Sequence, residues 1–208
     1  METDKKQIIL TKKDLKHFLN VESYMYCNAH KGRLFAYIDS LLSTPECDQY
    51  YLWRYVRTLR FCEFYLNNSY RYKRSILSIF YSLKYYLSLR KLRHYSYKTG
   101  IQISVNTFDI GLQIFHFGSI IVNENAKVGK NATILPGVVI GQKDGRVPII
   151  GDNCYIGAGC KILGGIVIGD NVIIAPNAVV VKDVPANSIV AGVPAKVIKQ
   201  KVNSNRYS

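Results

Sequence analysis

His116 is the residue in the second half of the chain whose type is best suited to acid–base chemistry. It is the only histidine after residue 100 and lies within GLQIFHFG, residues 111–118. A neutral imidazole can take a proton from a hydroxyl group, and a positioned general base contributes about 10²–10⁴ in rate. A lone histidine is more often structural than catalytic, so His116 by itself leaves both interpretations open.

Two further stretches carry basic side chains that could contact a charged ligand. The first is QKDGRVP, residues 142–148, which contains Lys143 and Arg146. The second is AGVPAK, residues 191–196, which ends at Lys196. Lysine and arginine can bind phosphate or carboxylate groups. Each stretch can equally be a surface loop without a ligand.

A sixfold apolar repeat indicates the element that must position these residues. From residue 108 onward an aliphatic or aromatic residue recurs at every sixth position, with one break, as at Val122, Val128, Ile134 and Ile140. A period of six fits neither a helix nor an alternating strand, and it is typical of a parallel β-helix built from hexapeptides. Residues 108–190 make about four three-sided coils. Four extra residues fall within 142–148, and a solenoid can expel such an insertion as a loop.

The first hundred residues show helical patterns instead. Thr11 and Asp14 have the spacing of a capping box, so a helix is predicted from there to about Glu22. Further helices are predicted over residues 32–42, 47–66 and 72–94. We therefore predict an α+β protein, with an α-helical N-terminal domain over residues 1–99 and a β-helix domain with a C-terminal tail over residues 100–208.

Charge and cysteine content limit which kinds of partner and which cellular compartment we expect. The formal net charge is +14, and residues 1–100 hold 18 Lys and Arg against 8 Asp and Glu. This excess favours anionic partners. No nucleic-acid motif accompanies it, so we predict no nucleic-acid partner. The tyrosine-rich helices are expected to pack as an amphipathic domain, and a peripheral contact of the basic 72–94 helix with a membrane surface is the alternative. The five cysteines form no CxxC pair, and no signal peptide is visible. A reducing, cytoplasmic location is expected, with Cys154 and Cys160 as buried small side chains.

Together these motifs resemble one protein family. The sixfold repeat, the IFHFG histidine, the expelled loop ending in VPIIGD, YIGAG at 155–159 and the AGVPAK ending look like the hexapeptide-repeat acetyltransferases. The most similar branches are the serine acetyltransferases and the O-acetyltransferases of bacterial surface-polysaccharide synthesis. The resemblance covers about residues 100–200. It implies a left-handed parallel β-helix, a homotrimer, and acetyl-CoA as co-substrate in a groove between neighbouring solenoids.

The resemblance also implies roles for individual residues. His116 would be the general base. The coenzyme groove would be lined by Gly141, Gln142, Ala158, Cys160, Ala175, Pro176 and Lys196. Lys143 and Arg146 of the expelled loop would reach the acceptor bound to an adjacent subunit. No metal is implied, and a zinc-dependent β-helix hydratase would need three nitrogen or sulfur ligands where the repeat half has a single histidine.

Three positions depart from the serine acetyltransferases. In that family an aspartate precedes the histidine and a second lies fifteen residues upstream; here Phe115 and Ile101 stand there. An Arg-His pair of the expelled loop is Arg146-Val147 here. Phe115 offers a flat apolar surface that suits a sugar ring. We therefore predict an acetyl-CoA-dependent O-acetyltransferase acting on a sugar hydroxyl of a bacterial surface polysaccharide or its precursor. Serine O-acetyltransferase is the alternative, and a non-catalytic β-helix scaffold is a lesser one.

Overall fold

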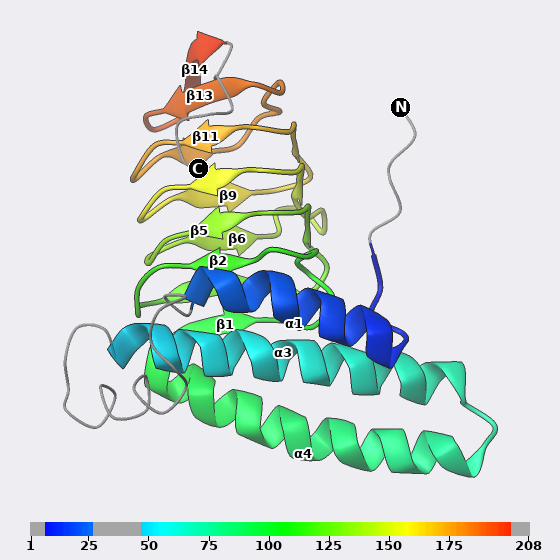
Figure 1. The fold of residues 1–208 in the computed structure, drawn as a ribbon. Coiled ribbons are helices and arrows are strands. Elements are labelled where there is room, and N and C mark those ends of the chain that lie inside the picture. The colour runs from blue at the N-terminus through cyan, green and yellow to red at the C-terminus, as the bar shows by residue number, and fades with distance from the viewer. Residues whose placement is uncertain (1–6, 27–46, 201–208) are drawn as a thin grey trace. The chain divides into compact units, whose positions relative to one another are not determined.

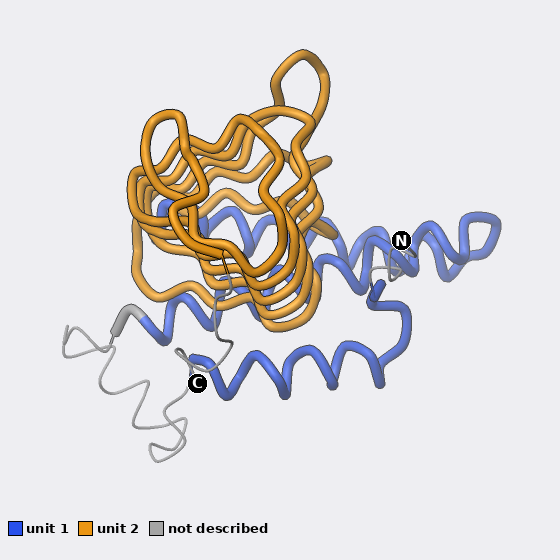
Figure 2. The backbone as a smooth tube through the Cα atoms, turned by 90° about the horizontal axis from the view of Figure 1, so that it is seen from above, with its two compact units in different colours: residues 1–100 blue, residues 101–208 orange. Residues whose placement is uncertain are grey.

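A computed structural model describes residues 7–26 and 47–200, and its chain divides into two compact units. The first unit is Met1–Gly100 and the second is Ile101–Ser208 (Figure 2). The first is helical and the second is a β-solenoid. The helix predicted over residues 32–42 lies outside the described residues.

The helical unit contains α1 (Lys12–Tyr26), α3 (Cys47–Arg71) and α4 (Ile76–Thr99). Within it α3 lies between α1 and α4 (Figure 1). The predicted capping box at α1 is confirmed. The Asp14 N–H donates to Thr11 Oγ1 at 3.1 Å, and the Thr11 N–H donates to Asp14 Oδ2 at 2.8 Å. The bond from the Thr11 backbone lowers the pKa of the Asp14 carboxyl.

Four predicted helix ends were wrong. Helix α1 continues past Glu22 to Tyr26, and α4 ends at Thr99 rather than at residue 94. Side-chain hydrogen bonds explain the other two. The expected stop at Asn67-Asn68 does not occur, because the Asn68 side chain donates to the Phe64 carbonyl at 2.8 Å and to the Leu10 carbonyl at 2.9 Å. The helix therefore continues to Arg71. The next helix begins at Ile76 rather than at residue 72, because the Ser75 side chain accepts from the Leu77 N–H and caps it.

The second unit is a parallel β-solenoid with three sheets. Sheet A contains β1 (Ile101–Ile103), β3 (Ile120–Val122), β6 (Val139–Gly141), β9 (Lys161–Leu163) and β12 (Val179–Val180). Sheet B contains β4 (Lys127–Val128), β7 (Ile149–Ile150) and β10 (Val167–Ile168). Sheet C contains β2 (Gln113–Ile114), β5 (Thr133–Ile134), β8 (Tyr155–Ile156), β11 (Ile173–Ile174) and β13 (Ser188–Ala191). Strand β14 (Lys196–Gln200) pairs antiparallel with β13 at the edge.

The sixfold repeat of the sequence becomes three columns of stacked core residues. Each column holds five side chains, all at most 6% exposed. The first is Ile103, Val122, Ile140, Ile162 and Val180. The second is Phe108, Val128, Ile150, Ile168 and Val184. The third is Ile114, Ile134, Ile156, Ile174 and Val190. The solenoid thus has five rungs rather than about four, because Ile103 of β1 completes a first rung with Phe108 and Ile114.

An asparagine ladder keeps the rungs in register at the corner between sheets B and C. Asn131, Asn153, Asn171 and Asn187 have φ of 54°, 55°, 56° and 57°. Asparagine tolerates this left-handed conformation better than most residues. Each side-chain amide donates to the next side-chain oxygen, at 3.0, 3.2 and 3.0 Å. Positions in successive rungs therefore stack directly, which fixes where each corner residue lies.

Candidate active site

His116 lies in a corner that is longer than its counterparts in the other rungs. The corner between sheets C and A runs from Ile114 to Val122, a step of 8 residues in the register. The three following corners step by 6: from 134 to 140, from 156 to 162 and from 174 to 180. We call residues 115–119 the His116 corner. The two additional residues bulge outward, and both Phe115 and His116 are exposed.

A glycine permits this corner to lie against the next rung. Gly118 has φ of 144°, and a Cβ atom there would lie 2.7 Å from Cβ of Pro136. The Gly137 N–H also donates to the Ser119 carbonyl at 2.7 Å and ties the corner to the rung beside it. Only glycine combines that backbone conformation with the close approach. The enlarged loop is therefore a fixed feature of the stack.

Phe115 and His116 present their rings side by side. The ring centroids are 6.5 Å apart with an interplanar angle of 37°, and Phe115 is 37% exposed. Among the described residues, none makes a hydrogen bond to the His116 ring. Catalytic histidines often gain their orienting contact only in the ligand complex. The arrangement offers an accessible nitrogen base beside an apolar surface.

Some predicted coenzyme residues lie in the same column of corners as the His116 corner. The Ser119 carbonyl accepts from the Gly137 N–H, the Pro136 carbonyl from the Gly159 N–H, and the Ala158 carbonyl from the Asn177 N–H, so these corners stack in successive rungs. Ala158 and Ala175 are half-buried, and Pro176 is exposed. Since neighbouring strands are about 4.8 Å apart, this column runs roughly 14 Å along the stack from the His116 corner to the corner that contains Pro176. It is a narrow strip of small side chains suited to an extended ligand.

Gly141, Gln142 and the expelled loop lie at the opposite edge of sheet A. Strand β6 ends at Gly141, and the next core residue in the register is Ile150, 10 residues after Ile140. Inside the loop, Lys143 and Arg146 exchange backbone hydrogen bonds of 3.0 Å in both directions. Within a single chain this loop and His116 are thus separated by the width of the sheet.

Two glycines of the following rung leave room for the expelled loop to pack against that rung. A Cβ atom on Gly164 would lie 3.4 Å from the Lys143 Cβ, and one on Gly165 would lie 2.6 Å from the Arg146 Cβ. The base of the Arg146 side chain therefore rests on the Gly165 backbone. The sixfold pattern does not mark this pair, because Ile162 and Ile168 keep the spacing of six across it.

Cys160 is buried rather than open to a groove, whereas Lys196 lies at the surface. Cys160 is 0% exposed, and its Sγ lies 3.0 Å from the Ala175 carbonyl oxygen. Burial raises the pKa of this thiol. Its side chain belongs to the core, so it cannot line a surface groove and we omit it from the site. Lys196 is exposed and begins β14, opposite Ala191.

Comparisons with known proteins agree with this architecture. Residues 148–182 match the bacterial transferase hexapeptide (six repeats) family, and residues 119–143 match the hexapeptide repeat of succinyl-transferase. A serine acetyltransferase of Staphylococcus aureus is 39% identical over 127 residues, which are 58% of this chain and 59% of that protein. The chain thus spans less than two thirds of the length of this curated relative.

Solved structures extend the similarity to the helical unit. A serine acetyltransferase of Brucella abortus in complex with coenzyme A is 27% identical, with a TM-score of 0.63 over 92% of this chain and 70% of that chain. One of Neisseria gonorrhoeae in complex with serine is 27% identical, with a TM-score of 0.58 over 90% of this chain and 70% of that chain. By these matches the solenoid is similar to the hexapeptide-repeat transferases, and the chain as a whole is similar in structure to serine acetyltransferases.

Proposed function

We propose that this chain is an acetyl-CoA-dependent O-acetyltransferase and that L-serine is its acceptor. The observation that carries the proposal is the exposed His116 in an enlarged corner of a hexapeptide solenoid. The donor and the acceptor are supported by the relatives solved with coenzyme A and with serine. The serine reading replaces the polysaccharide reading as the first choice, because the related proteins are named serine acetyltransferases.

His116 would act as the general base. Its ring nitrogen takes the proton of the acceptor hydroxyl while the oxygen attacks the thioester carbonyl. The tetrahedral intermediate then breaks its carbon–sulfur bond, and the imidazolium returns the proton to the departing coenzyme A thiolate. A backbone N–H near Gly141 and Gln142 would stabilise the oxyanion; removing one such donor typically costs about 10²–10³ in rate. The products are the O-acetyl ester and free coenzyme A.

The site would be shared between subunits of a homotrimer. His116 lies at one edge of sheet A, whereas Gly141, Gln142, Lys143 and Arg146 lie at the other. One chain therefore cannot bring both groups to a single small ligand. A neighbouring copy placed edge to edge would supply the second group. Ala158, Ala175, Pro176 and Lys196 then remain as the proposed contacts of the coenzyme.

A sugar hydroxyl is the second candidate acceptor, and one observation favours it. Residues 111–122 contain no acidic side chain that could pair with the ammonium group of an amino acid. The nearest one, Asp109, is 4% exposed and its Oδ1 accepts the Ile110 N–H at 2.6 Å. A buried ammonium needs a charged partner, whereas a sugar face can stack on the exposed Phe115 ring.

The free thiols favour a reducing compartment for this protein. Cys62, Cys154 and Cys160 are unpaired. Such cysteines persist in reducing environments. We therefore place the enzyme in the cytoplasm.

The test is direct assay of the purified chain with acetyl-CoA. Release of the coenzyme A thiol and the mass of the product are measured with L-serine and, in parallel, with a panel of nucleotide sugars and oligosaccharides. His116→Ala is expected to lower kcat by about 10² or more. The matched control is His17→Ala, which removes another exposed histidine. Circular dichroism of both variants verifies that they fold.

The outcomes separate the candidates. Turnover with L-serine that depends on His116 supports the proposal. Turnover only with sugars assigns the second candidate. An unchanged rate in His116→Ala removes this residue from the mechanism. If calorimetry finds no binding of acetyl-CoA, the chain is a scaffold and not an enzyme.

A further inference from the structure

Helix α4 leaves an apolar face exposed to solvent. With about 100° of rotation per residue, six of its exposed apolar side chains fall within an arc of about 120°, and exposed Leu77 lies outside it. We call these six the α4 stripe: Ile76, Ile79, Phe80, Leu83, Tyr86 and Leu87. Ile76 is 81% exposed and Ile79 is 71% exposed. Contiguous apolar surface of this kind marks an interaction site in soluble proteins.

The stripe is not used to hold the helical unit together. The opposite face of α4 packs inward through Leu92, Tyr95 and Thr99, which are at most 7% exposed. Near its start, the Tyr81 ring contacts Phe64 of α3 edge-on at 6.1 Å. Both faces of α4 are therefore apolar, and only one of them is covered among the described residues.

The surroundings of the stripe are uniformly basic. No acidic residue occurs between Glu63 and Asp109. Eight cationic side chains lie in this interval, and all are exposed: Arg71, Lys73, Arg74, Lys84, Arg90, Lys91, Arg93 and Lys98. Lys84 and Arg93 flank the stripe on its two sides, and the turn before α4 adds two more cations, Lys73 and Arg74. Any partner must accordingly be apolar in its centre and anionic around it.

A second copy of α4 does not meet this requirement. Parallel pairing along the stripe would bring Arg90 against Arg90, and antiparallel pairing would set the apolar first half against the basic second half. The flanking positions offer cations only, so no interhelical ion pairs could form. Like charges at such positions disfavour association. Charge complementarity therefore points away from self-pairing.

We propose that the α4 stripe docks on an anionic lipid surface. None of the helices in the described part of the chain has the length and apolar character needed to cross a bilayer. Helices that lie in the interface combine an apolar face with flanking lysine and arginine, as α4 does. Tyr70 and Tyr97, which are 68% and 89% exposed, are of a type enriched at the level of the headgroups. This inference does not depend on the acetyl-transfer proposal.

Vesicle co-sedimentation of the full chain tests the proposal. Neutral phosphatidylcholine vesicles are compared with vesicles that also contain phosphatidylglycerol, at low and at high salt. Binding is expected only to the anionic vesicles and should fall as salt rises. Lys84→Gln with Arg93→Gln should weaken binding by about fivefold for each charge removed. Lys127→Gln with Lys182→Gln makes the same charge change on the solenoid and should have no such effect.

A second pair of variants isolates the apolar contact. Ile79→Asn with Leu83→Asn removes two members of the stripe without changing charge and should weaken binding at least tenfold. Ile149→Asn with Val167→Asn is the control, since these side chains are also exposed at 50% and 47%. Because all four positions are at the surface, folding should survive, which circular dichroism verifies.

Several results would overturn the inference. One is absence of binding to anionic vesicles at low salt. Another is equal loss of binding in the stripe variants and in their solenoid controls. Lipid-free self-association that disappears in Ile79→Asn with Leu83→Asn would assign the face to a second copy. Capture of an acidic amphipathic helical peptide without any binding to vesicles would assign it to a protein partner.

Discussion

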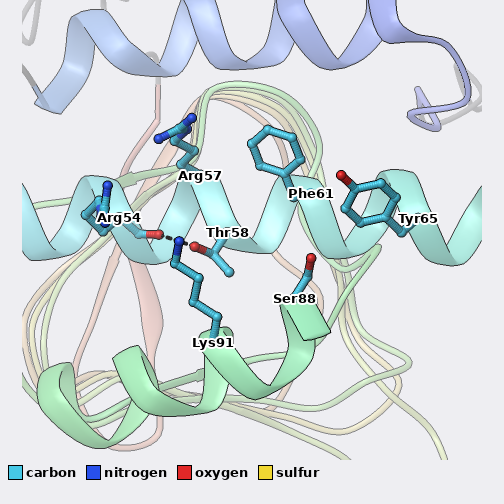
Figure 3. Close-up of a pocket in the computed structure, with 7 residues that line it drawn as sticks. All are labelled: Arg54, Arg57, Thr58, Phe61, Tyr65, Ser88 and Lys91. Atoms are coloured by element: carbon cyan, nitrogen blue, oxygen red, sulfur yellow. Dashed lines mark hydrogen bonds between the residues drawn. The ribbon is translucent and has the colours of Figure 1, made fainter. Parts of the chain in front are cut away.

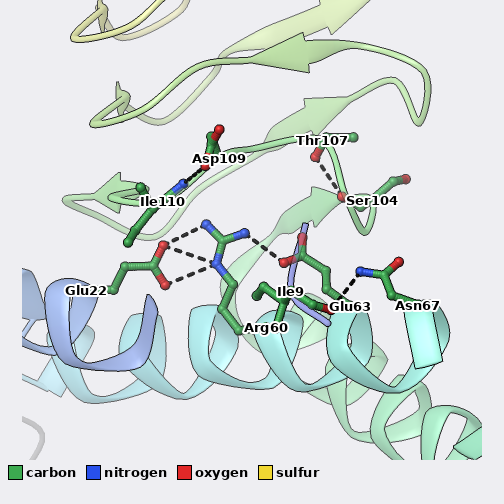
Figure 4. Close-up of polar contacts among 9 residues, drawn as sticks. All are labelled: Ile9, Glu22, Arg60, Glu63, Asn67, Ser104, Thr107, Asp109 and Ile110. Carbon is green, nitrogen blue, oxygen red and sulfur yellow. Dashed lines mark hydrogen bonds and ion pairs between the residues drawn. The ribbon is translucent and has the colours of Figure 1, made fainter. Parts of the chain in front are cut away.

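A buried ion triad joins two helices of the first unit, and its removal should destabilise that unit. The Arg60 guanidinium lies between Glu22 of α1 and Glu63 of α3 (Figure 4). It donates to Glu22 from Nε at 3.1 Å to each oxygen and from Nη2 at 2.6 Å, and to Glu63 from Nη1 at 2.8 Å. It also lies 5.1 Å from the centroid of the Phe18 ring. Burial alone would lower the Arg60 pKa, but attraction by the two carboxylates outweighs it and raises the pKa.

The cost depends on which member is removed. Arg60→Met leaves two carboxylates facing each other at 0% and 2% exposed. An unpaired buried charge of this kind destabilises by about 3–5 kcal/mol. Glu22→Gln instead leaves a neutral Arg60–Glu63 pair and one weaker acceptor, so about 1–3 kcal/mol is expected. Glu124→Gln changes an exposed glutamate and should stay within about 0.5 kcal/mol of the parent protein.

Urea unfolding followed by circular dichroism measures these differences at neutral and at acidic pH. In Arg60→Met, burial and mutual repulsion raise the carboxyl pKa of Glu22 and Glu63 in the folded state. A group whose pKa is higher in the folded state than in the unfolded state contributes stability at a pH below its unfolded-state pKa, which is about 4.3 for glutamate. That contribution is lost as the pH rises through its folded-state pKa. The deficit should therefore shrink on acidification. A deficit below about 1 kcal/mol, or one that does not change with pH, would refute this reasoning.

Three further changes probe the solenoid. Burial raises the pKa of the Cys154 thiol from 9.0 to about 12. The contribution of this thiol to folding stability should therefore be constant below pH 9 and should fall toward pH 12 by up to about 1.4 kcal/mol per pH unit. In urea unfolding experiments, Cys154→Ala should make the loss of stability at alkaline pH shallower. Asn153→Ala removes two hydrogen bonds of the asparagine ladder and leaves an alanine at φ of 55°. The free energy of unfolding should therefore fall by about 2–3 kcal/mol in the same measurement. A change near zero would show that the ladder does not stabilise the solenoid. Gly118→Ala should shift the His116 corner off Pro136 and reduce acetyl transfer about 100-fold while the circular dichroism stays unchanged; full activity would contradict the proposed geometry.

The solenoid was predictable because its signal is local and repeated. Each hexapeptide places one side chain in a core column, so Val122, Ile134 and Ile162 could be assigned without knowing their neighbours. The capping box at Thr11 was equally local. By contrast, Arg60 pairs with Glu22 at a distance of 38 residues in sequence. No periodicity encodes that contact.

The candidate site was predictable only in part. The step of eight residues between Ile114 and Val122 is visible in the sequence and marks the His116 corner, yet only the break near residue 145 was noticed. Cys160 was assigned both to the core and to the coenzyme groove, and its burial decides for the core. Which residues meet across subunits depends on how copies associate, and no pattern within one chain states that.

A cationic pocket in the helical unit shows why charge alone does not mark the reacting centre. It lies between α3 and α4 and contains Arg54, Arg57 and Lys91 (Figure 3). The Arg54 Nε donates to the Tyr95 hydroxyl at 3.0 Å, and the Arg57 guanidinium lies 5.5 Å from the centroid of the Phe61 ring. Arg54 and Arg57 thus make contacts within the helical unit. No histidine of the described part of the chain lines this pocket, so it lacks a side chain like His116 that could act as a general base.

The two corners that carry the proposed chemistry are also the two that lengthen the repeat. The His116 corner adds two residues and the expelled loop adds four, yet the core residues that follow them, Val122 and Ile150, remain 5% and 2% exposed in their columns. The insertions therefore leave the stack intact, because each rung is fixed by its inward side chains and by the ladder rather than by the length of its corners. Substitutions at His116, Lys143 or Arg146 should consequently change activity with little effect on unfolding. A loss of function at these residues can then be read as a loss of chemistry.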